Sequence, residues 1–168
     1  MDEKENILKL CLMGDGAVGK TTFCNRISSG IFNPAMAMTI GADIHVVRLT
    51  ILEPNSNPPN KVNITIQIWD LGGQQQYRFM QADFVKGAMG GILMYDLTRN
   101  STELNLGNWI SGIWREYNGT EVPLYLVGAK TDLLNPAALK LAEAHIKELA
   151  AELNISKYFL ISCSKSSI

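Results

Sequence analysis

The sequence has little of what marks secreted, membrane-spanning or nucleic-acid-binding proteins. It has only three cysteines in 168 residues, an odd number without a paired spacing, which argues against a disulfide framework. Lys and Arg total 15 and Asp and Glu total 16, so the net charge of -1 leaves no basic face for general binding of nucleic acid. No apolar run approaches the roughly 18 residues of a membrane span, and the polar N-terminus has no signal-peptide pattern. We therefore expect a cytoplasmic protein.

What the sequence does contain is the composition of one globular domain. Hydrophobic residues make up 46% and charged residues 18%, which is far from the composition of a disordered chain. A chain of 168 residues buries a core without disulfide or metal links. We expect a single domain over residues 1–168, and the sequence has no internal repeat.

Strand-like and helix-like segments alternate along the chain. Apolar or β-branched runs predict strands, and 3–4 periodicity with end signals predicts helices, one of them capped by Asn135 and Pro136. The alternation predicts an α/β fold with a mostly parallel, doubly wound sheet, helices on both faces and ligands at the carboxyl ends of the strands. The predicted strands are 7–13, 42–52, 62–70, 90–95, 124–128 and 158–162, and the predicted helices are 20–29, 106–117 and 136–153.

One segment has a biased composition. Residues 53–60 read EPNSNPPN, too long and too rich in proline for a two-residue hairpin turn. We expect a solvated loop between two antiparallel strands, 42–52 and 62–70. A partner-binding loop and a tolerated insertion both remain open for it.

Residues 14–21 read GDGAVGKT and match the G-x-x-x-x-G-K-[ST] phosphate loop, between a predicted strand and a predicted helix. Glycines let the backbone N–H groups turn toward a phosphate, and the helix adds its positive end. Lys20 would supply charge to the β- and γ-phosphates, and Thr21 a hydroxyl to Mg²⁺. The motif predicts a nucleoside triphosphate site whose candidate contacts are Asp15, Gly16, Ala17, Val18, Gly19, Lys20, Thr21 and Thr22.

A second motif, Trp69-Asp70-Leu71-Gly72-Gly73-Gln74, ends a predicted strand. Asp70 has the position of an acid that reaches Mg²⁺. Gly73 lacks a side chain, so its N–H can approach a γ-phosphate closely. Gln74 is placed to orient an attacking water, and its other interpretation is a plain polar loop residue.

These motifs resemble those of small GTPases of the Ras superfamily, nearest to the Rab, Ras and Rho branches. The resemblance covers about residues 7–165 and implies a P-loop NTPase G domain that binds GTP or GDP with Mg²⁺. Residues 32–41 resemble the first switch of Rab proteins, and the second switch would span about 70–83. Residues 129–132, AKTD, resemble the base motif, and residues 162–165, SCSK, the last base motif.

The resemblance also implies residue roles. Thr39 would bind Mg²⁺ and the γ-phosphate, Phe32 would pack against guanine, and Lys130 would lie along the base. Asp132 would accept hydrogen bonds from two guanine donors that adenine lacks. The last motif is ambiguous by one register, and its candidate contacts are Cys163, Ser164 and Lys165.

From these parts we expect a switch that hydrolyses GTP slowly. Gln74, Lys20 and Thr39 are the candidate catalytic residues, and no arginine is obviously placed to act in cis. An activating protein's arginine would then be worth about 10³–10⁵ in rate. Effector, exchange and activating proteins would bind through the two switches, and we expect a monomer.

Two alternatives differ in class. A pseudo-GTPase would hold nucleotide only as a binding or scaffold module, which Ala129 slightly favours and the intact Lys20, Thr39, Asp70 and Gln74 oppose. A phosphate-loop kinase would need an arginine-bearing lid, and no segment has that composition.

The sequence departs from the family pattern at several positions. Ala129 stands where a hydrogen-bonding Asn or Thr is usual, and one lost neutral hydrogen bond corresponds to roughly up to tenfold in affinity. Gln75 replaces the usual Glu, and Leu71-Gly72 is closer to the Arf-like pattern. The chain ends just after the last base motif without a prenylation cysteine. We therefore expect no membrane anchor in it and no final helix, either because it is truncated or because the fold closes without one.

Overall fold

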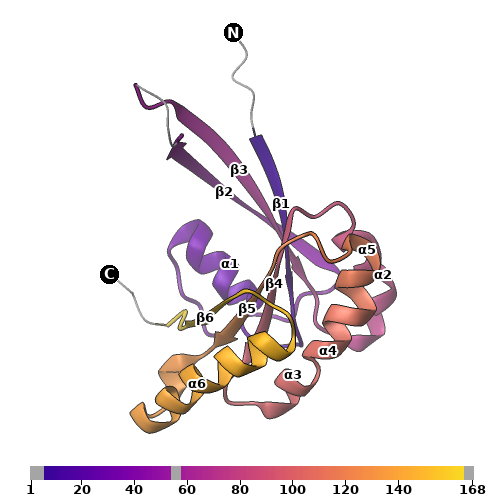
Figure 1. Cartoon of the computed structure of the whole chain (residues 1–168), viewed down its shortest axis with the longest axis vertical. Helices are drawn as coiled ribbons and strands as arrows, with labels where there is room; N and C mark the ends of the chain where they lie inside the picture. The colour runs from indigo at the N-terminus through magenta and orange to yellow at the C-terminus, as the bar shows by residue number, and fades with distance from the viewer. Residues whose placement is uncertain (1–5, 54–57, 165–168) are drawn as a thin grey trace.

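The computed structural model describes residues 6–53 and 58–164, and its centre is a twisted sheet (Figure 1). Its strands in these residues follow the order β2-β3-β1-β4-β5-β6. β1 pairs in parallel with β3 and β4, β5 and β6 continue in parallel, and β2 pairs antiparallel with β3. The mostly parallel sheet with one antiparallel strand is therefore confirmed. The strands are β1 (Asn6–Met13), β2 (Ala42–Leu52), β3 (Lys61–Leu71), β4 (Gly90–Asp96), β5 (Leu124–Ala129) and β6 (Lys157–Ile161).

Helices cover both faces of the sheet, but unequally. On one face α1 packs through Cys24 against a core of strand residues that includes Leu12 and Ile68. The other face carries the larger core, to which α2, α4 and α6 contribute Val85, Trp109 and Ile146. The helical segments are α1 (Lys20–Ser29), η1 (Gln75–Tyr77), α2 (Arg78–Val85), α3 (Asn100–Leu104), α4 (Leu106–Trp109), η2 (Ile110–Trp114), α5 (Arg115–Asn118), η3 (Thr131–Leu133) and α6 (Pro136–Glu152).

The predicted helix over 106–117 is interrupted by one π turn, η2. Side chains five residues apart lie about 140° apart on an α-helix, so Trp109 and Trp114 would not share a face there. A π turn, which closes i→i+5, brings such positions to one side. Both tryptophans are buried, together with the expected Leu106, Ile110 and Ile113. The sequence predicted the apolar face but not this turn.

Part of the sheet face that carries α1 stays exposed. Val47 packs against the α1-side core, and Leu49 and Ile51 point the same way because strand side chains alternate. Leu49 is 46% exposed and Ile51 43%. The question of a final helix concerns residues after Ser164, which lie outside the described part of the chain.

The cap of α6 generates a first prediction. The Asn135 side chain accepts a 2.8 Å hydrogen bond from the backbone N–H of Ala138, and Pro136 opens the helix. We expect Asn135→Ala to lower the free energy of unfolding by about 1 kcal/mol, since an N-terminal donor loses its acceptor. Urea denaturation followed by circular dichroism measures it. Asn135→Asp keeps an acceptor and should stay near wild type, and equal losses in both variants would contradict the capping role.

Candidate functional site

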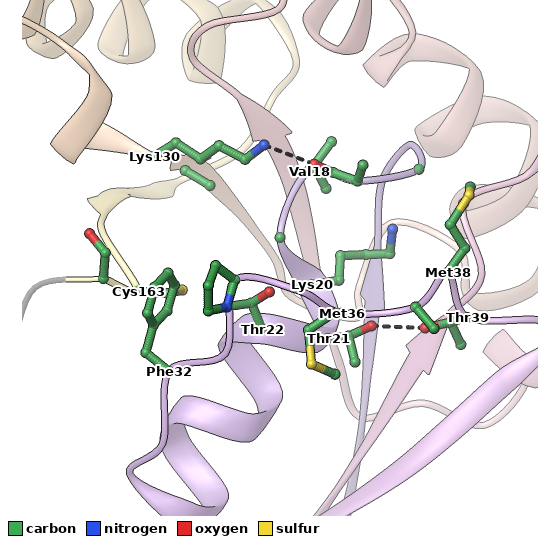
Figure 2. Close-up of a pocket in the computed structure, with 18 of the residues that line it drawn as sticks. Val18, Lys20, Thr21, Thr22, Phe32, Met36, Met38, Thr39, Lys130 and Cys163 are labelled. Carbon is green, nitrogen blue, oxygen red and sulfur yellow. Dashed lines mark hydrogen bonds between the residues drawn. The ribbon is translucent and has the colours of Figure 1, made fainter.

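A cavity of about 430 Å³ lies at the carboxyl ends of the parallel strands, where ligands bind in such folds. Phe32 and Cys163 stand at one end, and Lys20, Thr39 and Met38 at the other (Figure 2). Five separate stretches of the sequence, 16–22, 32–39, 73, 129–133 and 163–164, build this one site. Its lining consists of Gly16, Ala17, Val18, Gly19, Lys20, Thr21, Thr22, Phe32, Pro34, Met36, Ala37, Met38, Thr39, Gly73, Ala129, Lys130, Asp132, Leu133, Cys163 and Ser164.

The phosphate loop turns sharply between β1 and α1. Gly14 has a φ of 139°, and a Cβ there would lie 2.1 Å from the Met94 carbonyl oxygen, so only glycine fits. Ala17 also has a positive φ, 60°, which an L-residue rarely adopts. The Lys20 ammonium donates to the carbonyls of Gly14 and Asp15 at 2.7 and 2.8 Å. Burial lowers the pKa of Lys20 to about 8, against the opposing effect of Asp70 and Asp15.

Three oxygen-bearing side chains converge beside Lys20. The hydroxyls of Thr21 and Thr39 lie 2.8 Å apart, and both donate to one carboxylate oxygen of Asp70. The other oxygen, Oδ1, is buried and has no hydrogen-bond partner among the described residues. Burial raises the pKa of Asp70, and the hydrogen bond from Thr21 opposes that shift. An all-oxygen set with a buried unpartnered carboxylate atom fits a hard cation such as Mg²⁺.

Gly72 and Gly73 bring the segment after β3 against both other loops. The Gly72 N–H donates to the Gly41 carbonyl at 2.8 Å, and the buried Gln81 amide donates to the Gly72 carbonyl. A Cβ on Gly73 would lie 2.3 Å from both the Asp15 carbonyl carbon and the Gly16 nitrogen. The backbone of this segment therefore rests directly on the phosphate loop.

Gln74 is not one of the residues that line the cavity. Its amide nitrogen lies 3.7 Å from the sulfur of Met38, to which it donates, and its carbonyl oxygen accepts from Gln76 at 2.9 Å. Met38 directly precedes Thr39, so Gln74 is held against the predicted first switch. The structure thus brings Gln74 next to the cavity without making it a wall of it.

The opposite end of the cavity gathers the predicted base contacts. Phe32, Lys130 and Asp132 all line it, and Ser162 donates a 2.6 Å hydrogen bond to one Asp132 carboxylate oxygen. Cys163 and Ser164 also line it, and burial raises the pKa of the Cys163 thiol. Lys165, the remaining candidate, lies outside the described residues.

Asp15 is positioned differently from the other phosphate-loop candidates. Its carboxylate turns away from the cavity and accepts hydrogen bonds from Asn105 at 2.5 Å and from the Trp109 indole at 2.8 Å. It therefore fastens the loop to α4. Arg78 of α2 donates to Asn105 at 3.4 Å and lies over the Trp109 ring, so the same cluster reaches the second predicted switch.

Sequence reasoning missed several residues around the site. Met36 and Met38 line the cavity, and the signal was their place in the segment before Thr39. The sequence pattern assigned no site role to Arg99, yet its guanidinium donates to the Gly16 carbonyl at 2.7 Å. Its position three residues after β4, at the carboxyl edge of the sheet, is the clue that would have found it.

The sheet order, the glycine-rich loop and the converging Lys20, Thr21 and Asp70 define a phosphate-loop nucleotide-binding domain. Residues 9–167 match the Ras family. Human Ras-related protein Rab-27B is 34% identical over 160 residues, which cover 94% of this chain and 72% of that protein. The GTP-binding protein ypt3 of Schizosaccharomyces pombe is 36% identical over 155 residues, 92% and 67% of the two chains.

The chain belongs to the Ras family of small GTPases and is Rab-like. Ras-related protein SEC4 of Candida albicans agrees, with 32% identity over 160 residues, 95% of this chain and 70% of that protein. Membership brings the general properties of the family: guanine-nucleotide binding, GTPase activity, and switching through regulators and effectors.

The contact between Gly73 and the phosphate loop generates a second prediction. Gly73→Ala places a methyl group within 2.3 Å of the Asp15 and Gly16 backbone, so one segment must move away. We expect a GTP analogue to bind at least about tenfold more weakly, a loss of about 1.4 kcal/mol. Titration with a fluorescent analogue measures it. Gly107→Ala meets nothing within 4 Å and should bind as wild type, and equal affinities for all three proteins would contradict the contact.

Proposed function

We propose that residues 1–168 form one G domain that hydrolyses GTP slowly with Mg²⁺ and switches through residues 32–41 and 70–83. The convergence of Thr21, Thr39 and Asp70 beside Lys20 carries this proposal, because it joins the phosphate loop to both segments at one point. A plain nucleotide holder has no need of such a joint. We further propose that the protein acts as a cytoplasmic monomer, in keeping with its balanced charge and its composition.

The base end of the cavity supports guanine over adenine. The Asp132 carboxylate accepts hydrogen bonds but donates none, and guanine presents two donors, N1–H and its amino group, where adenine has an acceptor at N1. Ser162 orients this carboxylate through its 2.6 Å hydrogen bond. Phe32 and the stem of Lys130 line the same end and give the base apolar contacts.

Thr21, Thr39 and Asp70 would hold the Mg²⁺ ion. When bound, the ion supplies positive charge to the β- and γ-phosphate oxygens. Lys20 lies beside this set and adds a second cation at the same place. Backbone N–H groups of residues 16–21 add further donors for the phosphates, since Gly19 opens α1 with its helix N-terminus toward the cavity.

The reaction we propose is in-line attack of water on the γ-phosphate, with Gln74 orienting the water. Gln74 is engaged by Met38 and Gln76, so its side chain must leave these partners before it can serve the water. This requirement accounts for a slow intrinsic rate. A partner that frees Gln74, or that adds an arginine, would accelerate hydrolysis.

The switch we propose is the joint between residues 39–41 and 70–73, made of one backbone and one side-chain hydrogen bond. Gly72 bonds to Gly41, and Thr39 to Asp70, so the two segments support each other beside the phosphate loop. Loss of the γ-phosphate would remove contacts that hold Thr39 and Gly73 and release both segments. Ile40 and Phe79 are 71% and 75% exposed next to this joint, and they give partner proteins an apolar surface there.

Single-turnover hydrolysis tests the enzymatic part. Gln74→Leu removes the amide that orients water, and we expect GTP bound to it to be hydrolysed at least about tenfold more slowly than GTP bound to wild type. Gln75→Leu changes the exposed neighbour and serves as the matched control. Equal inertness of wild type and Gln74→Leu under all conditions would support the pseudo-GTPase instead.

The nucleotide that stays bound through purification tests the base assignment. We expect GDP or GTP, because Asp132 accepts from guanine donors that adenine does not have. Denaturation of the protein and chromatography of the released nucleotide identify it. Release of ADP or ATP would refute the assignment.

A further inference from the structure

Two cations that share one carboxylate hold the phosphate loop. Arg99 donates to the Gly16 carbonyl at 2.7 Å, and Lys130 donates to the Ala17 carbonyl at 3.0 Å. Both also contact the same oxygen of Asp96, at 3.0 Å from the Arg99 Nε and 2.8 Å from the Lys130 ammonium. Two side chains that are distant in the sequence, Arg99 and Lys130, thus donate hydrogen bonds to consecutive carbonyl groups of the loop.

Asp96 is well prepared for this role. Its side chain is 1% exposed, and its other oxygen accepts from the backbone N–H and the hydroxyl of Thr98 at 2.9 and 2.6 Å. Burial alone would raise the pKa of Asp96, but the hydrogen bonds from Lys130, Thr98 and Arg99 lower it below its ordinary value. The carboxylate therefore stays charged and holds both cations in place.

Ala17, which joins the two peptide groups whose carbonyls accept these hydrogen bonds, has a strained backbone conformation. Ala17 has a φ of 60°, in the left-handed region that alanine disfavours. Its φ and ψ are set by the orientations of the peptide groups before and after it, which carry the Gly16 and Ala17 carbonyls. A donor on each carbonyl fixes both orientations and so keeps Ala17 left-handed.

Of the two cations, Arg99 is the one that does not line the nucleotide cavity. Lys130 also lines the nucleotide cavity, whereas Arg99 does not, so Arg99 acts only on the loop. Its planar guanidinium spans Asp96 and Gly16 with two different nitrogens, whereas the Lys130 ammonium contacts Asp96 and Ala17 through one nitrogen. The turn that presents it is fixed by the Arg99 N–H donating to the Asp96 carbonyl at 2.9 Å.

We propose that Arg99 is a positioning residue for nucleotide retention, which clamps the Gly16 carbonyl and thereby holds Ala17 in its left-handed conformation. The inference rests on the guanine-nucleotide site of the proposed function. It assigns Arg99 no contact with the nucleotide. Its consequence is that nucleotide escapes faster when Arg99 is lost, by an amount that depends on the residue at position 17.

The rate of release of a fluorescent GDP analogue tests this in the full chain. We expect Arg99→Ala to release it about tenfold faster than wild type, the loss of a charge-assisted hydrogen bond on a partly exposed side chain. Arg99→Gln is shorter and uncharged, but its amide nitrogen takes the position of the arginine Nε beside Asp96, so it reaches one partner only and should fall between the two. Arg115→Ala removes an exposed arginine whose guanidinium bonds to Leu153, and it should release at the wild-type rate.

A double-mutant cycle separates positioning from general destabilisation. Glycine adopts a positive φ without the alanine penalty, so in an Ala17→Gly background the further change Arg99→Ala should accelerate release less than about threefold. An added alkylguanidinium should also slow release from Arg99→Ala, while an alkylammonium of the same chain length should not.

The outcomes distinguish a failure of the proposed function from a failure of the proposed role of Arg99. A wild-type protein that retains no guanine nucleotide refutes the proposed function. A wild-type protein that retains it, with Arg99→Ala and Arg99→Gln both within twofold of its release rate, refutes the clamp. An equal acceleration by Arg99→Ala in the wild-type and the Ala17→Gly backgrounds would also refute it, because the coupling to Ala17 would be absent.

Discussion

The site depends on how the carbonyl groups of the phosphate loop are held. Four consecutive carbonyls accept from cationic side chains: Gly14 and Asp15 from Lys20, Gly16 from Arg99, and Ala17 from Lys130. Each peptide N–H points opposite to its carbonyl, so the same bonds decide where the amides of the loop face. The three cations come from α1 and from the ends of β4 and β5. The sheet order, with β1, β4 and β5 adjacent, is what delivers them to one loop.

Buried carboxylates at the ends of two strands organise the charges around that loop. Asp70 at the end of β3 gathers Thr21 and Thr39, and Asp96 at the end of β4 gathers Arg99 and Lys130. The pKa values of the two carboxyl groups shift in opposite directions. Burial raises the pKa of Asp70, and the hydrogen-bonding partners of Asp96 lower its pKa. Both carboxylate oxygens of Asp96 thus have partners within the protein. Asp70 still has a buried carboxylate oxygen without a hydrogen-bond partner in the described residues. The first suits a structural support and the second a site that receives a cation.

Local patterns in the sequence predicted most of the fold and the contiguous parts of the site. Apolar runs gave every strand of the described sheet within a residue or two, and the loop over 14–21 lies where its motif indicated. Side chains that reach across the sheet were not predictable in this way, because no spacing rule links Arg99 to Gly16 or Trp109 to Asp15. The π turn was not predicted for a similar reason, because it brings two buried tryptophans to one side of the helix that a regular α-helix would separate. Patterns among residues that are close in the sequence predict helices and strands. Contacts between residues that are distant in the sequence can be predicted only once the order of the strands in the sheet is known.

The unusual Leu71-Gly72 pair gains a physical explanation from the joint between the two segments. A Cβ on Gly72 would lie 2.6 Å from the Thr39 carbonyl oxygen, and one on Gly73 would strike the Asp15 and Gly16 backbone. Two glycines in a row therefore let the chain touch the first segment on one side and the phosphate loop on the other, backbone to backbone. Backbone contacts of this kind are less adjustable than side-chain contacts, because no rotamer change relieves them. A displacement of either neighbour must then move residues 72–73, and Gln81, bonded to Gly72, carries that movement into α2.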